Sequence, residues 1–358
     1  WFHAASLGEF EQARPLIDTI RKEKNDAKIL LTFFSPSGYE VRKEYPQVTT
    51  VAYLPSDTAD NARWLLDIAR PRKVVFVKYE FWINLLTELK RRGIDTYLIS
   101  AIFRPGQIFF KPWGGLFRKA LHCYNEIFVQ NDESRRLLAS IGVTNVTVAG
   151  DTRFDRVREI RKNGKSFPLI ETWKGDEYTI VAGSSWGPDE LRYIPWLNDH
   201  PKNKAIIAPH EFDQKRLDEI RSMLTHPSML WSDVCEGSEI PESVQTVIVD
   251  TFGILSSLYR YADTVLIGGG FGAGIHNINE AAVWGVPVLF GPNHKKFKEA
   301  TDLLNAGGAF QYHTTEDAAN LLTLLKNDEC KRKEAADIAA RYIEENIGAS
   351  DLILKTIL

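Results

Sequence analysis

The sequence predicts an α/β protein built from two Rossmann-like domains with parallel sheets. Apolar runs of four to six residues alternate with helical patterns along most of the 358 residues, which is typical of βαβ units whose sheet is buried on both faces. The alternation is interrupted at 151–176, where the composition becomes polar. The length is too great for one ordinary core and fits two domains of about 150 to 180 residues.

The expected elements follow this alternation in order. A first domain over 1–160 is predicted to contain strands at 1–5, 29–34, 48–53, 74–77, 96–100, 127–130 and 146–149. A second domain over 161–345 is predicted to contain strands at 179–182, 205–208, 247–249, 265–267 and 286–290. The pattern from Glu316 to Ile357 is helical. Ligands are expected in a cleft to which the carboxyl ends of both sheets point.

Composition excludes several classes of protein. The net charge of −3 gives no global attraction to nucleic acid, and no apolar run is long enough to span a bilayer. Cys123, Cys235 and Cys330 lack metal-ligand spacing, and no His-Glu-x-x-His or Asp-x-Asp motif is present, so no metal site is predicted. The chain begins inside a predicted strand, and we therefore expect that a preceding segment is missing.

Residues 265–291 are the stretch around which the other motifs are interpreted. A predicted strand is followed by five glycines within 268–274 and then by a short helix. Glycines in this position allow a ligand to approach the backbone and leave N–H groups for an anion. Asn277 and Glu280 have the spacing of an N-cap and its reciprocal carboxylate, so Glu280 is either a cap alone or also a ligand contact.

Two glutamates at strand ends of the first domain are candidates for acid–base chemistry. Glu9 follows the first strand in Ser6-Leu7-Gly8-Glu9, and Glu80 follows the strand at 74–77. A carboxylate there projects into the expected cleft, where a general base is needed. Either glutamate is equally well explained as a helix-start residue that interacts with the helix dipole.

Several turns at predicted strand ends carry further candidates. Hydroxyls and amides near Ser37, Ser184 and Ser185 suit a sugar carboxylate or a phosphate, although Ser37 is equally suited to cap a helix. His210 is either a ligand contact or a surface turn residue. The turn Phe252-Gly253-Ile254 is of a kind against which a nucleobase commonly rests. The lysines after the last predicted strand either meet phosphate or membrane charge or are simply solvated: they are Lys295, Lys296 and Lys298.

Residues 102–119 interleave aromatic rings with cations and contain no acidic residue. This composition suits an anionic membrane surface or an amphiphilic anionic ligand. The alternative is an ordinary loop and helix with its rings packed inward. The residues concerned are Arg104, Phe109, Phe110, Lys111, Trp113, Phe117, Arg118 and Lys119.

Taken together, these motifs resemble the 3-deoxy-D-manno-octulosonic acid (Kdo) transferases that act on lipid A precursors. The matching stretches, in chain order, are 1–9 (WFHAASLGE), 36–38 (PSG), 53–57 (YLPSD), 79–84 (YEFWIN), 130–133 (QNDE), 150–155 (GDTRFD) and 268–291. The resemblance implies a GT-B architecture, with an acceptor domain, a CMP-Kdo domain and a C-terminal helix, within 346–358, that crosses back toward the first domain. It implies inverting transfer in lipopolysaccharide biosynthesis of Gram-negative bacteria, without metal or cofactor. Family members carry an N-terminal hydrophobic anchor, so we expect a location at the cytoplasmic face of the inner membrane.

The resemblance also implies roles for matching residues. Glu9 resembles the family's catalytic base, and Glu80 matches its second acceptor-domain glutamate. The expected donor-binding residues are Ser184, Ser185, His210, Phe252, Gly253, Ile254, Gly269, Gly270, Phe271, Gly272, His276, Asn277 and Glu280. The expected acceptor-binding residues are Ser6, Gly8, Ser37, Arg104 and Lys111, and the expected membrane contacts are Phe109, Phe110, Trp113, Arg118 and Lys119.

The chain departs from the family pattern at several positions. Lys78-Tyr79-Glu80 replaces the family's Glu-Thr-Glu, and Pro209-His210-Glu211 lacks its arginine. The alternatives are therefore another metal-free nucleotide-sugar enzyme, such as a different transferase or an epimerase, and a non-catalytic relative that binds the nucleotide sugar. A dehydrogenase is disfavoured because the glycine run lies late in the second domain and not in the first βα turn.

Overall fold

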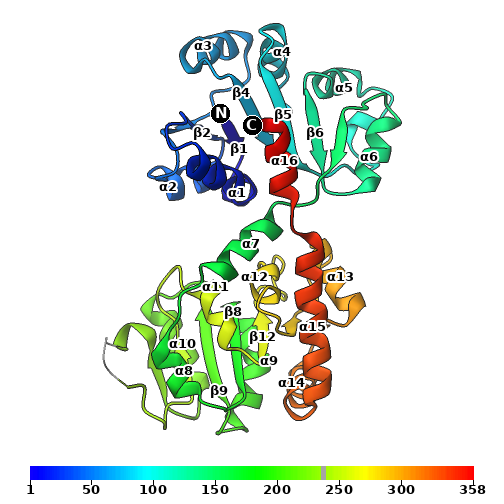
Figure 1. Ribbon diagram of the computed structural model, residues 1–358. Coiled ribbons are helices and arrows are strands. Elements are labelled where there is room, and N and C mark those ends of the chain that lie inside the picture. Colours follow the sequence, from blue (N-terminus) through cyan, green and yellow to red (C-terminus); the bar gives the residue numbers. More distant parts are fainter. Residues whose placement is uncertain (235–238) are drawn as a thin grey trace. The chain divides into compact units, whose positions relative to one another are not determined.

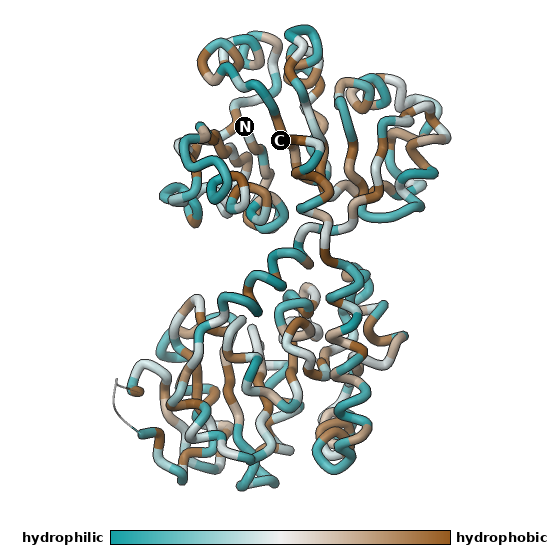
Figure 2. Tube along the Cα trace, in the orientation of Figure 1, coloured by the Kyte–Doolittle hydropathy of each residue, from teal (hydrophilic) through white to brown (hydrophobic). Residues whose placement is uncertain are grey.

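The computed structural model describes residues 1–234 and 239–358, so Cys235 lies outside the described residues. The chain forms two compact units (Figure 1). Unit 1 combines 1–156 with 346–358, and unit 2 consists of 157–345. Figure 2 shows apolar residues concentrated along the strands of each unit, whereas the loops are mostly hydrophilic.

Unit 1 contains a parallel sheet of seven strands in the order β3-β2-β1-β4-β5-β6-β7. The strands are β1 (Phe2–Ala4), β2 (Leu30–Phe33), β3 (Thr50–Tyr53), β4 (Lys73–Val77), β5 (Asp95–Ala101), β6 (Glu126–Val129) and β7 (Val146–Val148). The residues of the inner strands are mostly buried, as expected for a sheet with helices on both faces, whereas the edge strands β3 and β7 are half-buried or exposed.

The helices of unit 1 form two layers. One face of the sheet packs against α3 (Ala59–Ala69), α4 (Ile83–Arg91), α5 (Gly115–Leu121) and α6 (Asp132–Ala139). The other face packs against α1 (Leu7–Glu23) and α16 (Ala349–Ile357), whose Ile353 and Ile357 enter the same core as Phe10 of α1. The short helices α2 (Pro36–Arg42) and η1 (Ile108–Phe110) follow β2 and β5.

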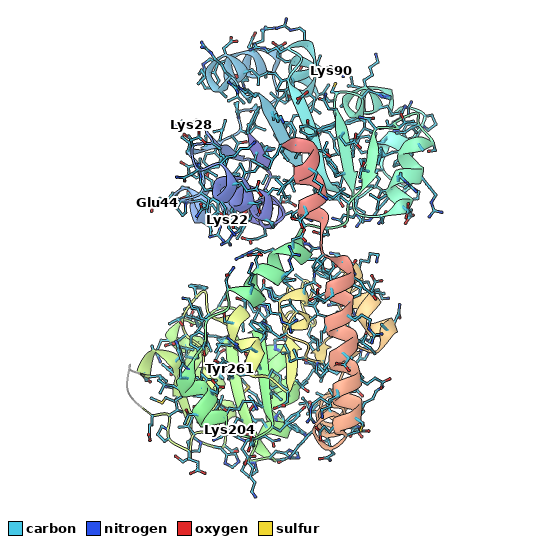
Figure 3. The ribbon with its side chains drawn as sticks, viewed as in Figure 1. Lys22, Lys28, Glu44, Lys90, Lys204 and Tyr261 are labelled. Atoms are coloured by element: carbon cyan, nitrogen blue, oxygen red, sulfur yellow. The ribbon has the colours of Figure 1, made fainter. Side chains whose placement is uncertain are left out.

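Three exposed lysines of unit 1 lie toward the amino edge of its sheet. Helices that follow parallel strands run back toward the amino ends of those strands. Lys22 at the end of α1, Lys90 at the end of α4, and Lys28 just before β2 are exposed (Figure 3), and their places in the chain put them toward the amino ends of the strands. They are therefore not part of a site at the carboxyl ends of the strands.

Unit 2 contains a second parallel sheet, in the order β10-β11-β9-β8-β12-β13-β14. The strands are β8 (Thr179–Ser185), β9 (Lys204–Pro209), β10 (Ser228–Leu230), β11 (Thr246–Ile248), β12 (Thr264–Ile267), β13 (Val288–Phe290) and β14 (Ala309–Gln311). The helices are α8 (Pro168–Lys174), α9 (Gly187–Asn198), α10 (Gln214–Met223), α11 (Leu255–Leu258), α12 (Asn279–Ala282), α13 (Lys298–Ala306), α14 (Thr315–Asn327) and α15 (Glu329–Asn346), with 3₁₀ turns η2 (Trp231–Asp233) and η3 (Tyr259–Tyr261).

The predicted fold is confirmed: two Rossmann-like units with parallel sheets, and a C-terminal helix that returns to the first. Three details differ. The polar stretch 151–176 is largely helical, because α7 (Arg153–Lys162) and α8 lie within it. The three-residue strands β10 and β14 were not predicted, since three residues carry too little alternation to be recognised. None of the helices in the described ranges has the length and apolar character that crossing a membrane requires.

Candidate active site

The predicted catalytic residues of unit 1 lie at the carboxyl ends of neighbouring strands. β2, β1, β4 and β5 are adjacent and parallel, so the loops that follow them meet at one edge of the sheet. The backbone amides of Phe34 and Ser35, after β2, both donate to the carbonyl oxygen of Ala5, after β1, at 3.3 and 2.8 Å. This contact joins the loop that carries Ser6 and Gly8 to the turn that carries Ser37.

Glu9 lies in the first turn of α1, with a side chain that is 20% exposed. The Ser6 hydroxyl donates a hydrogen bond to the Glu9 carboxylate, and the Lys78 ammonium nitrogen is 4.0 Å from Glu9 Oε1. Lys78 ends β4 in a left-handed conformation, with φ of 63°, which is uncommon for a residue with a side chain. The carboxylate is therefore held in place and remains accessible to a substrate hydroxyl.

Lys78 was not among the predicted site residues. The sequence marks it only as a departure from the family pattern, immediately after an apolar strand. Its amide donates to Ile99 of β5 at 2.9 Å, which keeps the sheet ladder intact while the chain turns. Strained backbone of this kind is concentrated at functional sites. The backbone angle is a property of the structure, so the departure from the family pattern is the signal by which the sequence could have pointed to Lys78.

Glu80 is buried, with 7% of the residue exposed, and ends a chain of hydrogen bonds. Trp1 Nε1 donates to Thr32 Oγ1 at 2.8 Å, Thr32 Oγ1 is 2.9 Å from His3 Nδ1, and His3 Nε2 is 3.0 Å from Glu80 Oε2. The indole can only donate, so Thr32 Oγ1 accepts from Trp1, while the Thr32 hydroxyl also lies 3.5 Å from the carbonyl oxygen of Phe2. Glu80, at the end of this chain, also accepts from Trp82 Nε1.

Glu80 is thus a buried carboxylate held by hydrogen bonds, whereas the Glu9 carboxylate is accessible. Its backbone carbonyl accepts from the Tyr124 hydroxyl, and Trp82 follows at the N-cap of α4. Asp57 accepts from the Asn84 and Leu85 amides, at 3.0 and 2.9 Å, and so caps α4 from another loop. The cap of α4 is therefore supplied by Asp57 and not by Glu80.

The segment 102–119 is only partly a surface. Phe109 is 3% exposed and packs in the core with Phe103, so the predicted membrane contact of Phe109 is wrong. Arg118 donates to the carbonyls of Phe109 and Lys111 at 3.0 and 2.8 Å, so its guanidinium stabilises the loop by hydrogen bonds within the segment. Trp113, at 73% exposed, and Leu116, at 57% exposed, are large apolar residues that this segment does present.

Two more cations lie in this region of unit 1. Arg104, after β5, is exposed and donates to the Tyr79 hydroxyl at 3.4 Å, which brings it toward the β4 loop. Lys111 is half-buried and follows η1. Phe110 and Phe117 are half-buried against the core, and Lys119 is exposed.

In the described part of unit 2, two cavities lie at the carboxyl edge of the sheet. The first, which we name the β8–β11 cavity, has a volume of about 280 Å³. It brings together five predicted donor residues: Ser184, His210, Phe252, Gly253 and Glu280. Phe252 is 83% exposed and contacts Phe212 with a ring separation of 4.5 Å. Asn277 Nδ2 donates to Glu280 Oε1 at 3.0 Å, and Asn277 Oδ1 accepts from the Asn279 amide at 3.2 Å.

Three rings stack beside this cavity. His210 lies between Trp186 and His276, with ring separations of 4.6 and 4.4 Å. Burial first, and then the nearby His210, lower the pKa of His276 below its ordinary value. His276 is therefore uncharged near pH 7 and offers a hydrogen bond but no positive charge. The sequence did not single out Trp186, although it follows the hydroxyl-rich turn.

The glycine run packs mainly against the protein itself. A Cβ on Gly268 would collide with Ser184 of the β8 loop, and one on Gly270 would collide with Gly291 of the β13 loop. The Gly269 amide donates to Asp189 Oδ2 at 2.9 Å, and the Gly272 and Gly274 amides donate to Gly269 O. The amides of Gly269, Gly272 and Gly274 are therefore not free for an anion, which corrects the predicted role of these three glycines as phosphate donors.

Other predicted donor residues are also internal. The Ser185 hydroxyl is buried and donates to Glu190 at 2.7 Å, which corrects its assignment as a ligand contact. Ile254 is buried at the start of α11. Phe271 is half-buried, with the Arg192 guanidinium 3.7 Å from its ring centre.

The second cavity, which we name the β12–β14 cavity, has a volume of about 630 Å³. It is lined by Gly272, Ala273, Pro292, Asn293, Lys295, Lys296, Gln311 and His313. Within the described ranges, no group of three or more His, Cys, Asp or Glu residues is placed to hold a metal ion.

Comparison with known proteins bears on this geometry. Residues 1–156 match the family described as 3-deoxy-D-manno-octulosonic-acid transferase (kdotransferase). Kdo transferases from Bordetella pertussis and Aquifex aeolicus are each 26% identical to the chain, covering 98% and 96% of it and 84% and 92% of their own lengths. The chain is thus similar to Kdo transferases over nearly its whole length. The predicted resemblance and the predicted enzyme class, a glycosyltransferase, are confirmed.

Solved structures agree on the fold. The UDP-GlcNAc 2-epimerase of Neisseria meningitidis, solved with UDP-GlcNAc, superposes with a TM-score of 0.67 at 17% identity, covering 99% of this chain and 98% of that one. At this identity the likeness shows the two-domain fold alone. The individual site residues of this Kdo-transferase relative remain predictions.

Proposed function

We propose that the protein transfers Kdo from CMP-Kdo to a lipid A precursor, with inversion and without a metal cofactor. The observation that carries the proposal is the Glu9 carboxylate, held by Ser6 and Lys78 at the carboxyl end of β1 in a chain related to Kdo transferases throughout. A fixed, accessible carboxylate at this edge is suited to general-base chemistry.

In this mechanism, Glu9 accepts the proton of the acceptor hydroxyl as its oxygen attacks the anomeric carbon of Kdo. The bond between that carbon and the CMP phosphate oxygen breaks, and CMP leaves with the electron pair. The Lys78 ammonium nitrogen is 4.0 Å from Glu9 Oε1, and its positive charge stabilises the ionised carboxylate of the base. Glu80 acts through the hydrogen bonds of His3 and Trp82 as a positioning residue for the neighbouring loop.

Unit 2 is proposed to bind the donor nucleotide. In the β8–β11 cavity, the Glu280 carboxylate is suited to accept hydrogen bonds from ribose hydroxyls, and the exposed ring of Phe252 offers an aromatic face to a base. The uncharged imidazole of His276, at one end of the ring stack, offers a hydrogen-bond donor without positive charge.

The test is transfer from CMP-Kdo to a tetraacyl lipid A precursor, followed by mass spectrometry of the lipid. We expect Glu9→Gln to lower the transfer rate about 10²- to 10⁴-fold, the range for loss of a general base, while CMP still stabilises the variant against heat. Glu23→Gln, at the exposed end of the same helix, is the matched control and should retain full activity. Transfer by Glu9→Gln within a few-fold of the unsubstituted protein would exclude Glu9 as the base. Stabilisation by UDP in place of CMP would favour another nucleotide-sugar enzyme.

We also propose that unit 1 works at the cytoplasmic face of the bacterial inner membrane. Support comes from exposed Trp113 and Leu116, which lie in an acid-free segment beside exposed Lys119 and Arg104. Co-sedimentation with vesicles containing anionic lipid is expected to fall for Trp113→Ser and Leu116→Ser. Trp64→Ser, which removes a tryptophan of α3 that is 58% exposed, is the control, and an equal loss in that variant would contradict the assignment.

A further inference from the structure

The two cavities of unit 2 differ in charge. The β8–β11 cavity is lined by one carboxylate, Glu280, and by no lysine or arginine. The β12–β14 cavity is lined by Lys295 and Lys296, together with His313, and by no acidic residue. Both lie at the carboxyl ends of one parallel sheet, and the loop 268–276 separates them.

The β12–β14 cavity is built from three adjacent strand ends. Asn293, after β13, donates through Nδ2 to Gly272 O at 2.8 Å and through its amide to Gly270 O at 2.9 Å. Its carbonyl accepts from the Ile275 amide at 3.3 Å. Asn293 thereby fixes the tip of the glycine loop against the loop that carries the lysines.

The far wall of this cavity is also fixed. Gln311 ends β14, and its side chain contacts the His313 ring. The His313 carbonyl accepts from Arg192 Nε at 2.8 Å, and its amide donates to Asp317 at 3.0 Å. The two lysines therefore line the same cavity as a polar wall that carries an amide and an imidazole side chain.

The nucleoside and the sugar of the donor differ in charge in the same way that suits the two cavities. A nucleoside is neutral and presents ribose hydroxyls, which suit a carboxylate. The sugar of the donor is an acid, and its carboxylate needs cations or donors in place of water. The exposed lysines offer point charges whose attraction for an anion is sensitive to salt.

We propose that the β12–β14 cavity binds the carboxylate-bearing sugar of the donor, with Lys295 and Lys296 as its specificity-determining contacts. This inference rests on the proposed function, because it assigns a subsite to the same donor. It gives a reason for the hydrogen bonds that anchor the glycine loop to the loop that carries the lysines.

The experiment measures the KM for CMP-Kdo and the inhibition constant of CMP in the same transfer assay. Lys295→Ala and Lys296→Ala are each expected to raise the donor KM about tenfold, equivalent to one lost charge-assisted contact, with the CMP inhibition constant unchanged within about twofold. Lys296→Arg keeps the charge and should restore most of the donor affinity. Lys298→Ala removes the same charge from the next helix, where Lys298 pairs with Asp302 and does not line the cavity, and it should leave both constants unchanged.

Each other outcome overturns the assignment. Weaker CMP inhibition in parallel with the higher donor KM would place the lysines on the phosphate, and an equal effect of Lys298→Ala would indicate a general field of positive charge. Unchanged constants in the alanine variants would exclude the cavity while leaving the proposed function intact. If the unsubstituted protein neither binds CMP nor transfers Kdo, the proposed function fails, and this subsite with it.

Discussion

Thr32 is the residue that links the amino-terminal strand to Glu80. Its hydroxyl accepts from Trp1 and lies 2.9 Å from His3 Nδ1, and all three residues are buried. Thr32→Val keeps the shape but leaves the indole N–H without an acceptor and His3 Nδ1 without its hydrogen-bond partner. We expect the free energy of unfolding to fall by about 1–3 kcal/mol, the cost of buried polar groups without partners, measured by urea unfolding of unit 1.

Thr32→Ser is the matched control, because it removes a methyl group and retains the hydroxyl. The serine variant should recover most of the stability that the valine variant loses. If both variants were equally destabilised, packing of the methyl group and not the hydrogen-bond chain would account for the loss.

At the scale of residues, the sequence predicted where the site residues lie along the strands better than it predicted which residues surround them. Glu9 and Glu80 were both found as strand-end carboxylates, yet the structure makes one accessible and buries the other. Position along a strand follows from a local pattern. The partners of Glu80 come from residues 1–3, 32 and 82, and no local pattern shows which distant residues a fold brings together.

At the scale of elements, α16 contributes core residues to a sheet that lies far from it in sequence. Ile353 is fully buried in the cluster that contains Phe10 and Phe33, and Figure 1 shows α16 lying against the sheet of unit 1. We expect Ile353→Ala to lower the stability of unit 1 by about 2–5 kcal/mol through the lost contacts and the cavity left behind. Leu352→Ala, one residue away and 39% exposed, should change it by less than about 0.5 kcal/mol. Urea midpoints that were equal for the two variants would contradict this role of α16.

The glycine run shows where prediction from elements reached its limit. The pattern of strand, glycines and helix was correctly located, but its glycines were interpreted as a surface for phosphate. Gly268 and Gly270 are required because the β8 and β13 loops press against them. Strand neighbours in a parallel sheet are set by crossover connections, so the order β8-β12-β13, and with it the reason for these glycines, is not written in the stretch itself.

At the scale of the molecule, unit 1 is assembled from both ends of the chain. Asp155, just before the division at residue 156, accepts from the Gly348 and Ser350 amides at 2.6 and 2.7 Å and so anchors the start of α16. Sequence patterns indicated two domains and a terminal helix. They did not reveal this anchor, since Asp155 and Gly348 are separated by the whole of unit 2.

This arrangement predicts that the two units differ when separated. Unit 2 is continuous and has its own core, so the fragment 157–345 should fold and unfold cooperatively alone. The fragment 1–156 lacks α16 and should have a lower Tm than the same fragment joined to 346–358 by a short Gly-Ser linker, which suffices because Asp155 holds the two ends together. Thermal unfolding of both fragments, with Ile353→Ala in the joined form as control, measures this difference. The control should lose most of the gain, since the stabilisation comes from burying the apolar face of α16. Equal Tm values with and without 346–358 would mean that α16 rests on a core already complete without it.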